Sequence, residues 1–414
     1  MMCMGGLSIV YIVNTVYPFH DGGYERRFFE LARRLAMRGC SVTVFTSAPR
    51  FTRYFNVDFV DVCYDDGFFT RSGFRSIGRE LRFSVNLFRK LMEYRGLVGD
   101  ADIVEVNQTP PFHIFPVRLF KTLSNGRFLT VMTVHEDLMD YFGDYWRIRL
   151  HGLSPIRIDR FLGLASKSLY LNSLSCADYY VSPSKPTLKS LLSHGLDRDR
   201  VFYIPNGIDT ELQGRYCSTS HDDGKVVVSF LGRLVPEKRP EWVMYALKWI
   251  LNIDPKLMDC LEVNIIGKGP LTPILNGLVK KFSLDRIVKL RGYVPDDEKF
   301  SLLARSSIFT LPSRREGFSL SLLEAMFFGA APIVTVDPFR MGVRGVLELV
   351  SHLRNGYVAY SFREFREGLY RLIVDDDLRS ELGRKAAETA KRYDWNSIIP
   401  LAENIYRRIS SGVV

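Results

Sequence analysis

The chain has 414 residues, which is long for one ordinary hydrophobic core, so we expect two domains of about 200 residues each. Hydrophobic residues make up 46% of the sequence and charged residues 25%, proportions that are typical of a soluble globular protein. The formal net charge of +10 indicates an anionic partner, and charge alone leaves nucleic acid, a phosphorylated substrate and a membrane surface open.

Cysteine spacing and apolar run lengths predict the compartment. The six cysteines are scattered, without a Cys-x-x-Cys pair or histidines at zinc spacing, so we expect reduced thiols. No apolar run reaches the roughly 18 residues that a membrane-spanning helix needs. The first apolar run is short and lacks a preceding basic region, which favours a strand over a signal peptide. We therefore expect a cytoplasmic protein.

The N-terminal pattern predicts a strand, loop, helix and strand of Rossmann type. An apolar run over 7–13 precedes a loop that ends in Asp21-Gly22-Gly23, and helical spacing from Tyr24 leads to a second strand at 41–45. Gly22 and Gly23 allow a ligand to approach the backbone at the helix start, although a plain turn gives the same pattern. Gly-x-Gly-x-x-Gly is absent, so a dinucleotide site is unsupported.

His135 is placed at the carboxyl end of a predicted strand. Apolar runs at 58–64, 103–106 and 128–134 predict further strands, and the last leads into Thr133-Val-His-Glu-Asp. Ligands of open α/β sheets bind at this edge. A single histidine is more often structural than catalytic, and the residues alone leave both explanations open.

Two segments of the N-terminal half combine basic and apolar residues. The segment 75–95 predicts a helix with apolar residues on one face, namely Ile77, Leu81, Val85, Phe88 and Leu91 or Met92. Six Arg or Lys residues against two Glu residues make it a basic amphipathic helix that can lie on an anionic membrane. The segment 147–167 is similar. A surface helix that packs on the domain core gives the same pattern, so both interpretations stay open.

A polar, strand-free segment over 210–224 is the best candidate linker, and it follows a Pro-Asn-Gly-Ile-Asp turn at 205–209. The second half opens with a parallel-type strand at 226–231. Arg233 and Lys238 occupy the loop at its carboxyl end, where a guanidinium and an ammonium suit a diphosphate. Further strands are predicted at 263–266, 288–290, 308–311 and 331–336, and helices at 378–392 and 397–409.

The most informative stretch is Pro312-Ser-Arg-Arg-Glu-Gly-Phe-Ser-Leu-Ser-Leu-Leu-Glu324, between a predicted strand and a predicted helix. Such a helix start presents free backbone N–H groups and a positive dipole end to an anion. Glu316 lies in the turn and Glu324 inside the helix, so both carboxylates can face one crevice and bind the hydroxyls of two sugars. The alternative is a capping acid and an exposed helix face.

The motif Glu-Gly-Phe-x-x-x-x-Leu-Glu-Ala-Met resembles the signature of the retaining GT4 glycosyltransferases with the GT-B fold. The resemblance covers nearly the whole chain. It implies an α/β protein with two Rossmann-like domains facing a central cleft. Residues 1–207 correspond to the acceptor-binding domain, joined by a returning C-terminal helix at 394–414, and residues 208–393 to the nucleotide-sugar-binding domain.

The resemblance also implies roles for individual residues. Glu316 corresponds to the residue that contacts the donor sugar, Glu324 to the ribose contact, and His135 to a histidine near the sugar. Arg233 and Lys238 correspond to the pair that neutralises the diphosphate. The remaining donor-binding positions are Gly22, Gly23, Tyr293, Gly317, Phe318, Ser319 and Leu320. Ser319 stands where the family usually has glycine, and its hydroxyl can still cap the helix.

These features predict a retaining hexosyltransferase that moves a hexose from a UDP-, GDP- or similar sugar to a lipid-linked or carbohydrate acceptor. No Asp-x-Asp motif lies near the site, so we expect no metal and no cofactor, and contact with the inner face of the membrane stays open. The alternatives are a GT-B sugar epimerase and a basic nucleic-acid- or membrane-binding protein without catalysis. We expect no nucleic-acid partner, since the usual binding motifs are missing.

Overall fold

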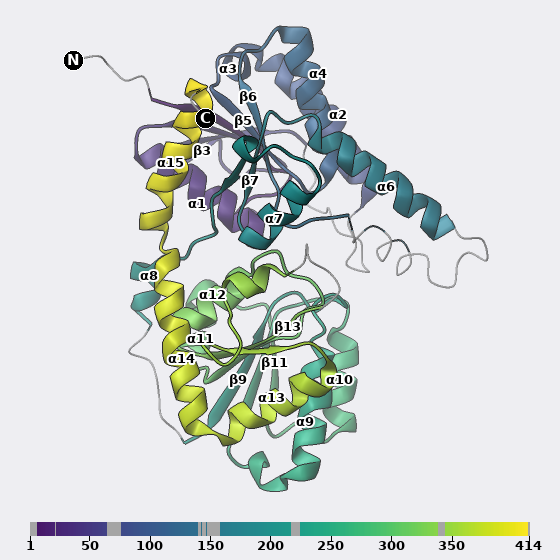
Figure 1. Ribbon diagram of the computed structural model, residues 1–414, viewed down its shortest axis with the longest axis vertical. Coiled ribbons are helices and arrows are strands. Elements are labelled where there is room, and N and C mark those ends of the chain that lie inside the picture. Colours follow the sequence, from purple (N-terminus) through teal and green to yellow (C-terminus); the bar gives the residue numbers. More distant parts are fainter. Residues whose placement is uncertain are drawn as a thin grey trace. The chain divides into compact units, whose positions relative to one another are not determined.

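The computed structural model describes most of the chain, namely residues 6–20, 22–63, 76–139, 142, 146, 158–216, 224–337 and 344–412. The chain forms two compact units (Figure 1). The first contains the described residues up to Pro205 and those from Ile398 onward, and the second contains Asn206–Ser397. Each unit has its own sheet and its own core, so each is described separately.

The first unit is built on an eight-stranded sheet in the order β3-β4-β2-β1-β5-β6-β7-β8. Its strands are β1 (Ser8–Ile12), β2 (Ser41–Thr46), β3 (Arg53–Tyr54), β4 (Val57–Asp61), β5 (Ile103–Asn107), β6 (Leu129–Thr133), β7 (Tyr179–Ser182) and β8 (Val201–Tyr203). All neighbours are parallel except β3 and β4, which form an antiparallel hairpin. The sequence did not predict β3, because a two-residue strand has no periodicity to detect.

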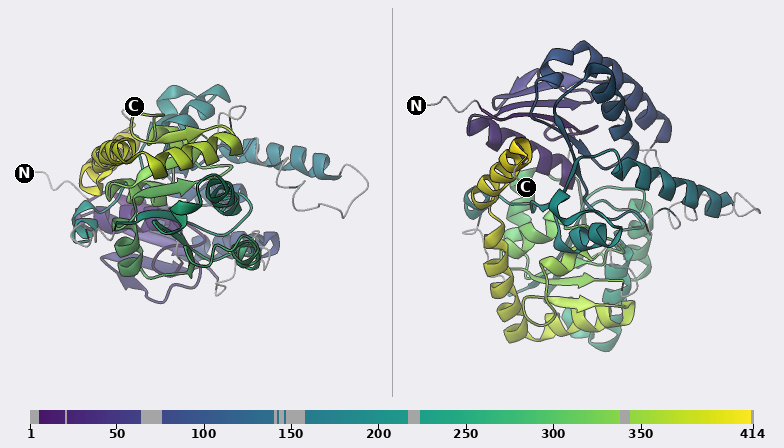
Figure 2. Two further views of the ribbon diagram at one scale, coloured as in Figure 1. Left: turned by 90° about the horizontal axis from the view of Figure 1, so that it is seen from below. Right: turned by 45° about the horizontal axis from the view of Figure 1, so that its top comes forward.

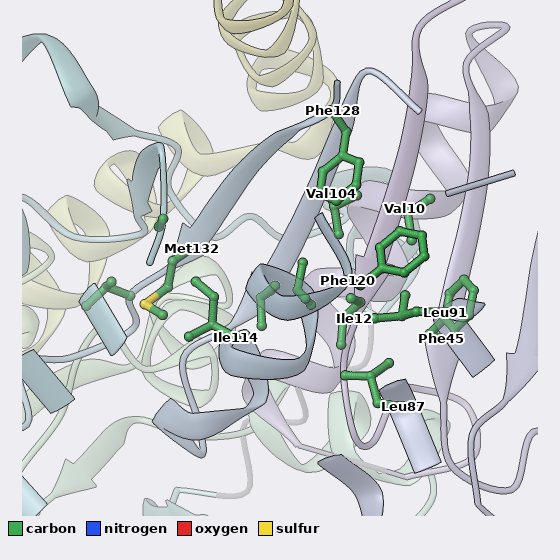
Figure 3. Close-up of a cluster of buried hydrophobic side chains, with 14 of the residues drawn as sticks. Val10, Ile12, Phe45, Leu87, Leu91, Val104, Ile114, Phe120, Phe128 and Met132 are labelled. Atoms are coloured by element: carbon green, nitrogen blue, oxygen red, sulfur yellow. The ribbon is translucent and has the colours of Figure 1, made fainter. Parts of the chain in front are cut away.

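Helices cover this sheet and close its core. They are α1 (Gly23–Met37), α2 (Ile77–Glu93), α3 (Arg95–Gly99), α4 (Ile114–Ser124), α6 (Ile158–Leu174) and α7 (Lys185–Ser193), with short 3-10 turns η1 (Pro111–His113) and η2 (Arg198–Arg200). Figure 3 shows part of the core, where Leu87 and Leu91 of α2 and Phe120 of α4 join Ile12 and Phe45 of the sheet in one buried cluster.

The second unit has a six-stranded, all-parallel sheet in the order β11-β10-β9-β12-β13-β14. Its strands are β9 (Val226–Leu231), β10 (Leu261–Ile266), β11 (Val288–Gly292), β12 (Ile308–Leu311), β13 (Ala331–Thr335) and β14 (Tyr357–Ala359). Its helices are α9 (Glu241–Ile253), α10 (Thr272–Lys281), α11 (Asp296–Ala304), α12 (Leu320–Phe327), α13 (Phe362–Val374) and α14 (Asp376–Ala390), with 3-10 turns η4 (Pro255–Met258), η6 (Gly345–Glu348) and η7 (Lys391–Tyr393).

Within the described residues, the chain passes between the units at two places. After Pro205 it enters the second unit, where α8 (Thr210–Gly214) forms a short helix in the segment that the sequence marked as a linker. It returns within α15 (Trp395–Ser411). The start of α15 is fastened to the junction by backbone hydrogen bonds between Ile208 and Tyr393 at 2.9 Å and between Trp395 and Ile208 at 3.1 Å.

Strand order reverses once in each sheet, and this fixes where a ligand site can form. In the first unit the reversal lies between β1 and β5, and in the second it lies between β9 and β12. At such a point the following loops leave in opposite directions and open a crevice beyond the carboxyl ends of the strands. The loops that follow these four strands therefore define a candidate site in each unit.

The described part of α15 is anchored to the first unit by a buried polar network. Glu105 of β5 is fully buried and accepts hydrogen bonds from Tyr406 at 2.6 Å and from the Thr133 hydroxyl. The Tyr11 hydroxyl lies 3.3 Å from that of Tyr406. Burial raises the pKa of Glu105, and the two hydrogen bonds and the positive charge of Arg27 oppose that rise. Ionisation of this carboxyl group therefore has an energetic cost in the folded state.

We expect Glu105→Gln to remove one pH-dependent part of stability. Because the pKa of Glu105 is raised above 4.5 by folding, its contribution is fully present below 4.5 and is lost as pH rises through the folded value. An amide keeps hydrogen bonds to both hydroxyls and does not titrate. Urea denaturation at several pH values measures the unfolding free energy of both proteins. As pH rises, the unfolding free energy of the wild type should fall relative to that of the variant. Glu93→Gln, at an exposed carboxylate of α2, is the control, and parallel pH curves for wild type and Glu105→Gln would contradict this account.

None of the helices in the described part of the chain combines the length and apolar character needed to span a bilayer.

Candidate active site

The signature stretch forms the loop between β12 and α12, at the strand-order reversal of the second unit. Ser319 is the N-cap of α12, and its Oγ accepts a hydrogen bond from the N–H of Leu322 at 3.3 Å. Its φ of 79° lies in the left-handed region, where glycine is favoured. The first turn of α12 thus presents the positive end of a helix beside the loop.

Glu316 is held in this loop by a lysine from the neighbouring loop. Its carboxylate is 9% exposed and forms an ion pair with Lys238. Ser313 also donates a hydrogen bond to it, at 2.8 Å. The N–H of Arg314 donates to the carbonyl of Glu237 at 2.8 Å, so the loops after β9 and β12 are joined through their backbones. The structure therefore brings together two residues that the sequence predicted for one site.

Glu324 has a lysine partner that the sequence analysis did not identify. Nζ of Lys299, in α11, lies 2.9 Å from the Glu324 carboxylate and 3.1 Å from Asp296, and both Lys299 and Glu324 are 7% exposed. The ammonium also lies 4.1 Å from the centroid of the Phe300 ring. In the sequence, Lys299 follows three acidic residues at a helix start, a pattern typical of a solvated surface, so nothing marked it as buried.

Glycines allow the loops of the second unit to touch backbone to backbone. A side chain at Gly267 would overlap the carbonyl of Gly232, and one at Gly345 would overlap the carbonyl of Gly317. The N–H of Gly345 donates to the carbonyl of Glu316 at 3.0 Å, which ties the start of η6 to the signature loop. Gly345 could not be identified from the sequence, because a single glycine after a distant strand carries no signal of its partner.

Five other predicted residues lie in the same unit. Arg233 is exposed in the loop after β9, and Tyr293 is 57% exposed after β11, with the ammonium of Lys268 5.8 Å from its ring centroid. Phe318 is 3% exposed and packs edge-on against Tyr393, so its side chain belongs to the core and leaves its backbone for ligand contact. Leu320 and Gly317 are partly buried at the start of α12.

The first unit contributes its own loops at the β1–β5 reversal. Gly22 is the N-cap of α1 and has an extended conformation. A Cβ atom at Gly22 would overlap the carboxylate of Glu25. At Gly23, a Cβ would have no atom of another described residue within 4 Å, apart from its chain neighbours and the backbone of its own helix. His135 lies near this turn, since its ring is 5.8 Å from that of Tyr24 and 6.0 Å from that of Phe28. The turn and the histidine therefore belong to one local arrangement.

A buried glutamine fixes the backbone around His135. Gln108 follows β5, is fully buried, and accepts a hydrogen bond from the N–H of His135 at 3.1 Å. Its amide donates to the carbonyl of Glu136 at 2.9 Å and to Tyr170 at 3.1 Å. Asp137 accepts hydrogen bonds from the N–H of Met139 at 2.9 Å and from Ser190, and lies 2.6 Å from His194 Nε2. Neither Gln108 nor Asp137 could be recognised as an anchor from the sequence.

Burial sets the protonation state of His135. Desolvation, with a smaller contribution from the positive charge of Arg27, lowers the pKa of His135 to about 3. The imidazole is therefore neutral near pH 7 and has one donor and one acceptor nitrogen. Its Nε2 is buried and has no hydrogen-bond partner among the described residues. A neutral ring of this kind can bind a hydroxyl group but does not supply positive charge.

Acidic and histidine side chains do not gather into a metal-binding cluster in the part of the chain that the structure describes.

The fold places the chain in a class of proteins with two Rossmann-like domains. It is similar to sucrose-phosphate synthase from Thermosynechococcus elongatus, with a TM-score of 0.74, 18% identity, and coverage of 98% of this chain and 100% of that one. It is also similar to HepE from Anabaena in complex with UDP and glucose, with a TM-score of 0.67, 17% identity, and coverage of 96% and 99%. The class is the GT-B fold, as the sequence predicted.

Sequence comparison defines the family. Residues 21–212 match the family model Glycosyltransferase Family 4, and residues 218–389 match Glycosyl transferases group 1. A D-inositol 3-phosphate glycosyltransferase from Streptomyces bingchenggensis is 23% identical over 254 residues, which cover 58% of this chain and 54% of that protein. The chain thus spans about half the length of that curated relative. It belongs to the GT4-type glycosyltransferases with the GT-B fold. This membership does not favour the epimerase, nucleic-acid-binding or non-catalytic alternatives.

We expect two substitutions of Ser319 to have opposite effects on stability. Ser319→Gly relieves the left-handed backbone conformation and should raise the unfolding free energy by about 1 kcal/mol, since glycine is also an acceptable N-cap. Ser319→Ala keeps the strain and removes the cap, and should lower it by about 1 kcal/mol. Thermal denaturation of the three proteins measures both changes, and equal loss in both variants would show that the hydroxyl outweighs the backbone strain.

Proposed function

We propose that this protein transfers a hexose from a nucleoside diphosphate sugar to an acceptor hydroxyl group, with retention of configuration at the anomeric carbon. The observation that carries the proposal is the pair of buried carboxylates at the β9–β12 reversal, Glu316 and Glu324, each paired with a lysine. Carboxylates bind the vicinal hydroxyls of sugars, and the start of α12 beside them suits a diphosphate. Membership of the GT4-type family supports the same reaction.

In this proposal the second unit binds the donor. Glu316 accepts hydrogen bonds from the hexose, Glu324 accepts them from the ribose, and the backbone near Tyr293 contacts the base. As the glycosidic bond breaks, negative charge grows on the leaving diphosphate. Arg233, Lys238 and the N–H groups around Gly317, Ser319 and Leu320 stabilise this charge. We propose that these groups act in place of a divalent cation.

For the first unit we propose roles for neutral groups. His135 is neutral near pH 7, so it orients a hexose hydroxyl by hydrogen bonding rather than by charge. Gln108 and Asp137 hold the backbone of the loop that carries it. Gly22 and Gly23 let phosphate or acceptor approach the backbone at the start of α1. The acceptor is a lipid-linked molecule or a polysaccharide.

The reaction is tested by incubating the protein with UDP-, GDP- and ADP-hexoses in EDTA, with and without a lipid extract, and measuring nucleoside diphosphate release. We expect release from one donor despite EDTA, increased by lipid, and reduced about a hundredfold or more in Glu316→Gln and Lys238→Ala. NMR of the product gives the anomeric configuration.

A surface pair of the same unit provides the matched controls. Glu381 and Lys385 lie 2.7 Å apart on α14, so Glu381→Gln and Lys385→Ala alter the same residue types away from the loops and should retain activity. If no donor is bound or cleaved under any condition by the folded wild type, the proposed reaction is wrong.

Lys299→Met tests the ribose site separately from catalysis. Without its cation, the buried Glu324 carboxylate loses its main partner and its fixed orientation. We expect the dissociation constant for the free nucleoside diphosphate, measured by calorimetry, to rise about tenfold or more, and Lys299→Arg to restore part of the affinity. Lys385→Met is the control. Unchanged affinity in a folded Lys299→Met protein would place the ribose elsewhere.

A further inference from the structure

Helix α2 has two apolar faces and buries only one of them. Phe83, Leu87 and Leu91 are fully buried, and Figure 3 shows the two leucines in the core of the first unit. A second row, defined here as the outer row, remains on the surface, with exposed fractions of 39% for Ile77, 51% for Leu81, 56% for Val85 and 41% for Met92. The sequence analysis assigned these residues, Phe88 and Leu91 or Met92 to one face. The structure decides between the two alternatives: Met92 belongs to the outer row and Leu91 to the buried row, and Phe88 is partly buried.

The rotation of α2 that exposes the outer row is fixed by a buried carboxylate. Glu80 is 1% exposed and accepts two hydrogen bonds from the amide of Asn14, at 2.9 and 3.1 Å. His113 Nε2 lies 3.3 Å from the same carboxylate. Turning the helix to bury Leu81 and Val85 would draw Glu80 away from these partners and expose the leucines of the buried row. The outer row therefore cannot be buried within this unit at low cost.

Basic residues border the outer row. At 100° per residue, the exposed Arg82 and Arg89 fall between the outer row and the polar face of α2, next to Val85 and Met92. Glu80 is turned inward, so it does not offset their charge on the surface. An aliphatic row with arginines along its edge is the arrangement of a helix that lies in the interface of an anionic bilayer.

Helix α6 repeats this chemistry on the same unit. Phe161 and Leu164 are 70% and 68% exposed, with the exposed Arg160 and the partly buried Lys167 nearby in sequence. Figures 1 and 2 show the first turns of α6 extending beyond the sheet of this unit. Of the predicted basic segment 147–167, only the part from Ile158 onward lies within the described residues.

We propose that the outer row of α2 docks on an anionic membrane surface, with Ile77, Leu81, Val85 and Met92 entering the acyl boundary and Arg82 and Arg89 contacting lipid headgroups. Charge decides between this occupant and a second copy of the chain. Pairing of two outer rows would bring the arginines of both copies together in a protein with a net charge of +10. Anionic lipid neutralises them instead.

Docking does not depend on the donor chemistry. Its consequence for the acceptor does rest on the proposed function: an enzyme held on a bilayer by its first unit meets acceptors that are themselves anchored in lipid. Of the two acceptor classes proposed above, docking therefore favours the lipid-linked one.

The test is sedimentation of the full-length protein with vesicles of phosphatidylglycerol and phosphatidylcholine in equal parts, compared with phosphatidylcholine alone. We expect binding to the anionic vesicles only. Leu81→Ser/Val85→Ser should lower the partition coefficient about tenfold or more. Arg82→Gln/Arg89→Gln should lower it about fivefold for each charge removed and flatten its salt dependence.

The matched control replaces two aliphatic residues of equal exposure in the second unit. Ile253 and Ile274 are 53% and 55% exposed, and Ile253→Ser/Ile274→Ser should bind vesicles as the wild type does. Unchanged melting temperatures show that the exposed substitutions leave the fold intact. Leu164→Ser measures the contribution of α6 independently.

Three outcomes would overturn the assignment. The wild type could ignore anionic vesicles, the Leu81→Ser/Val85→Ser protein could bind them unchanged, or binding could be lost only in Leu164→Ser. Light scattering identifies the competing occupant: a wild-type dimer that Leu81→Ser/Val85→Ser converts to monomer, without vesicle binding, makes the outer row an interface between copies. Because these readouts do not involve sugar transfer, they fail independently of the proposed reaction.

Discussion

A carboxylate buried at the edge of a sheet keeps a fixed direction when a side chain of opposite charge lies beside it, and the second unit contains two such pairs. Glu316 is paired with Lys238 from the loop after β9, and Glu324 with Lys299 from α11. In each pair the lysine comes from a different element than the carboxylate. The first pair therefore joins the loops after β9 and β12, and the second joins α11 to α12. A sugar hydroxyl that reaches either carboxylate finds it already desolvated and directed.

The loops around these pairs approach more closely than side chains would permit. Gly267 lies against Gly232, and Gly345 lies against Gly317, with no room for a Cβ at either contact. The hydrogen bond from Gly345 to the carbonyl of Glu316 then fixes the peptide that carries the carboxylate. Electrostatic pairing sets the direction of Glu316, and backbone contact sets its position.

In the first unit, the backbone around His135 is held by a neutral side chain. Gln108 binds the backbone on either side of His135, whose low pKa keeps the imidazole uncharged. Behind the β1 loop, Glu80 joins Asn14 to α2 and so fixes which face of that helix meets solvent. One buried carboxylate thus links the loop of the candidate site to the surface that we assign to the membrane.

The sequence by itself determined the alternation of strands and helices and the two-domain α/β class. It also determined the loops that carry Arg233, Lys238, Glu316 and Glu324. These features were readable because periodicity, turn residues and a dense local motif are encoded within short stretches. Only the tertiary structure revealed Lys299, Gln108 and Gly345. Their contacts with Glu324, His135 and Glu316 join residues that lie 25 or more positions apart and leave no periodic trace. It also decided which apolar face of α2 is buried. That choice depends on Asn14 and the sheet core, which the helix meets only when the chain is folded.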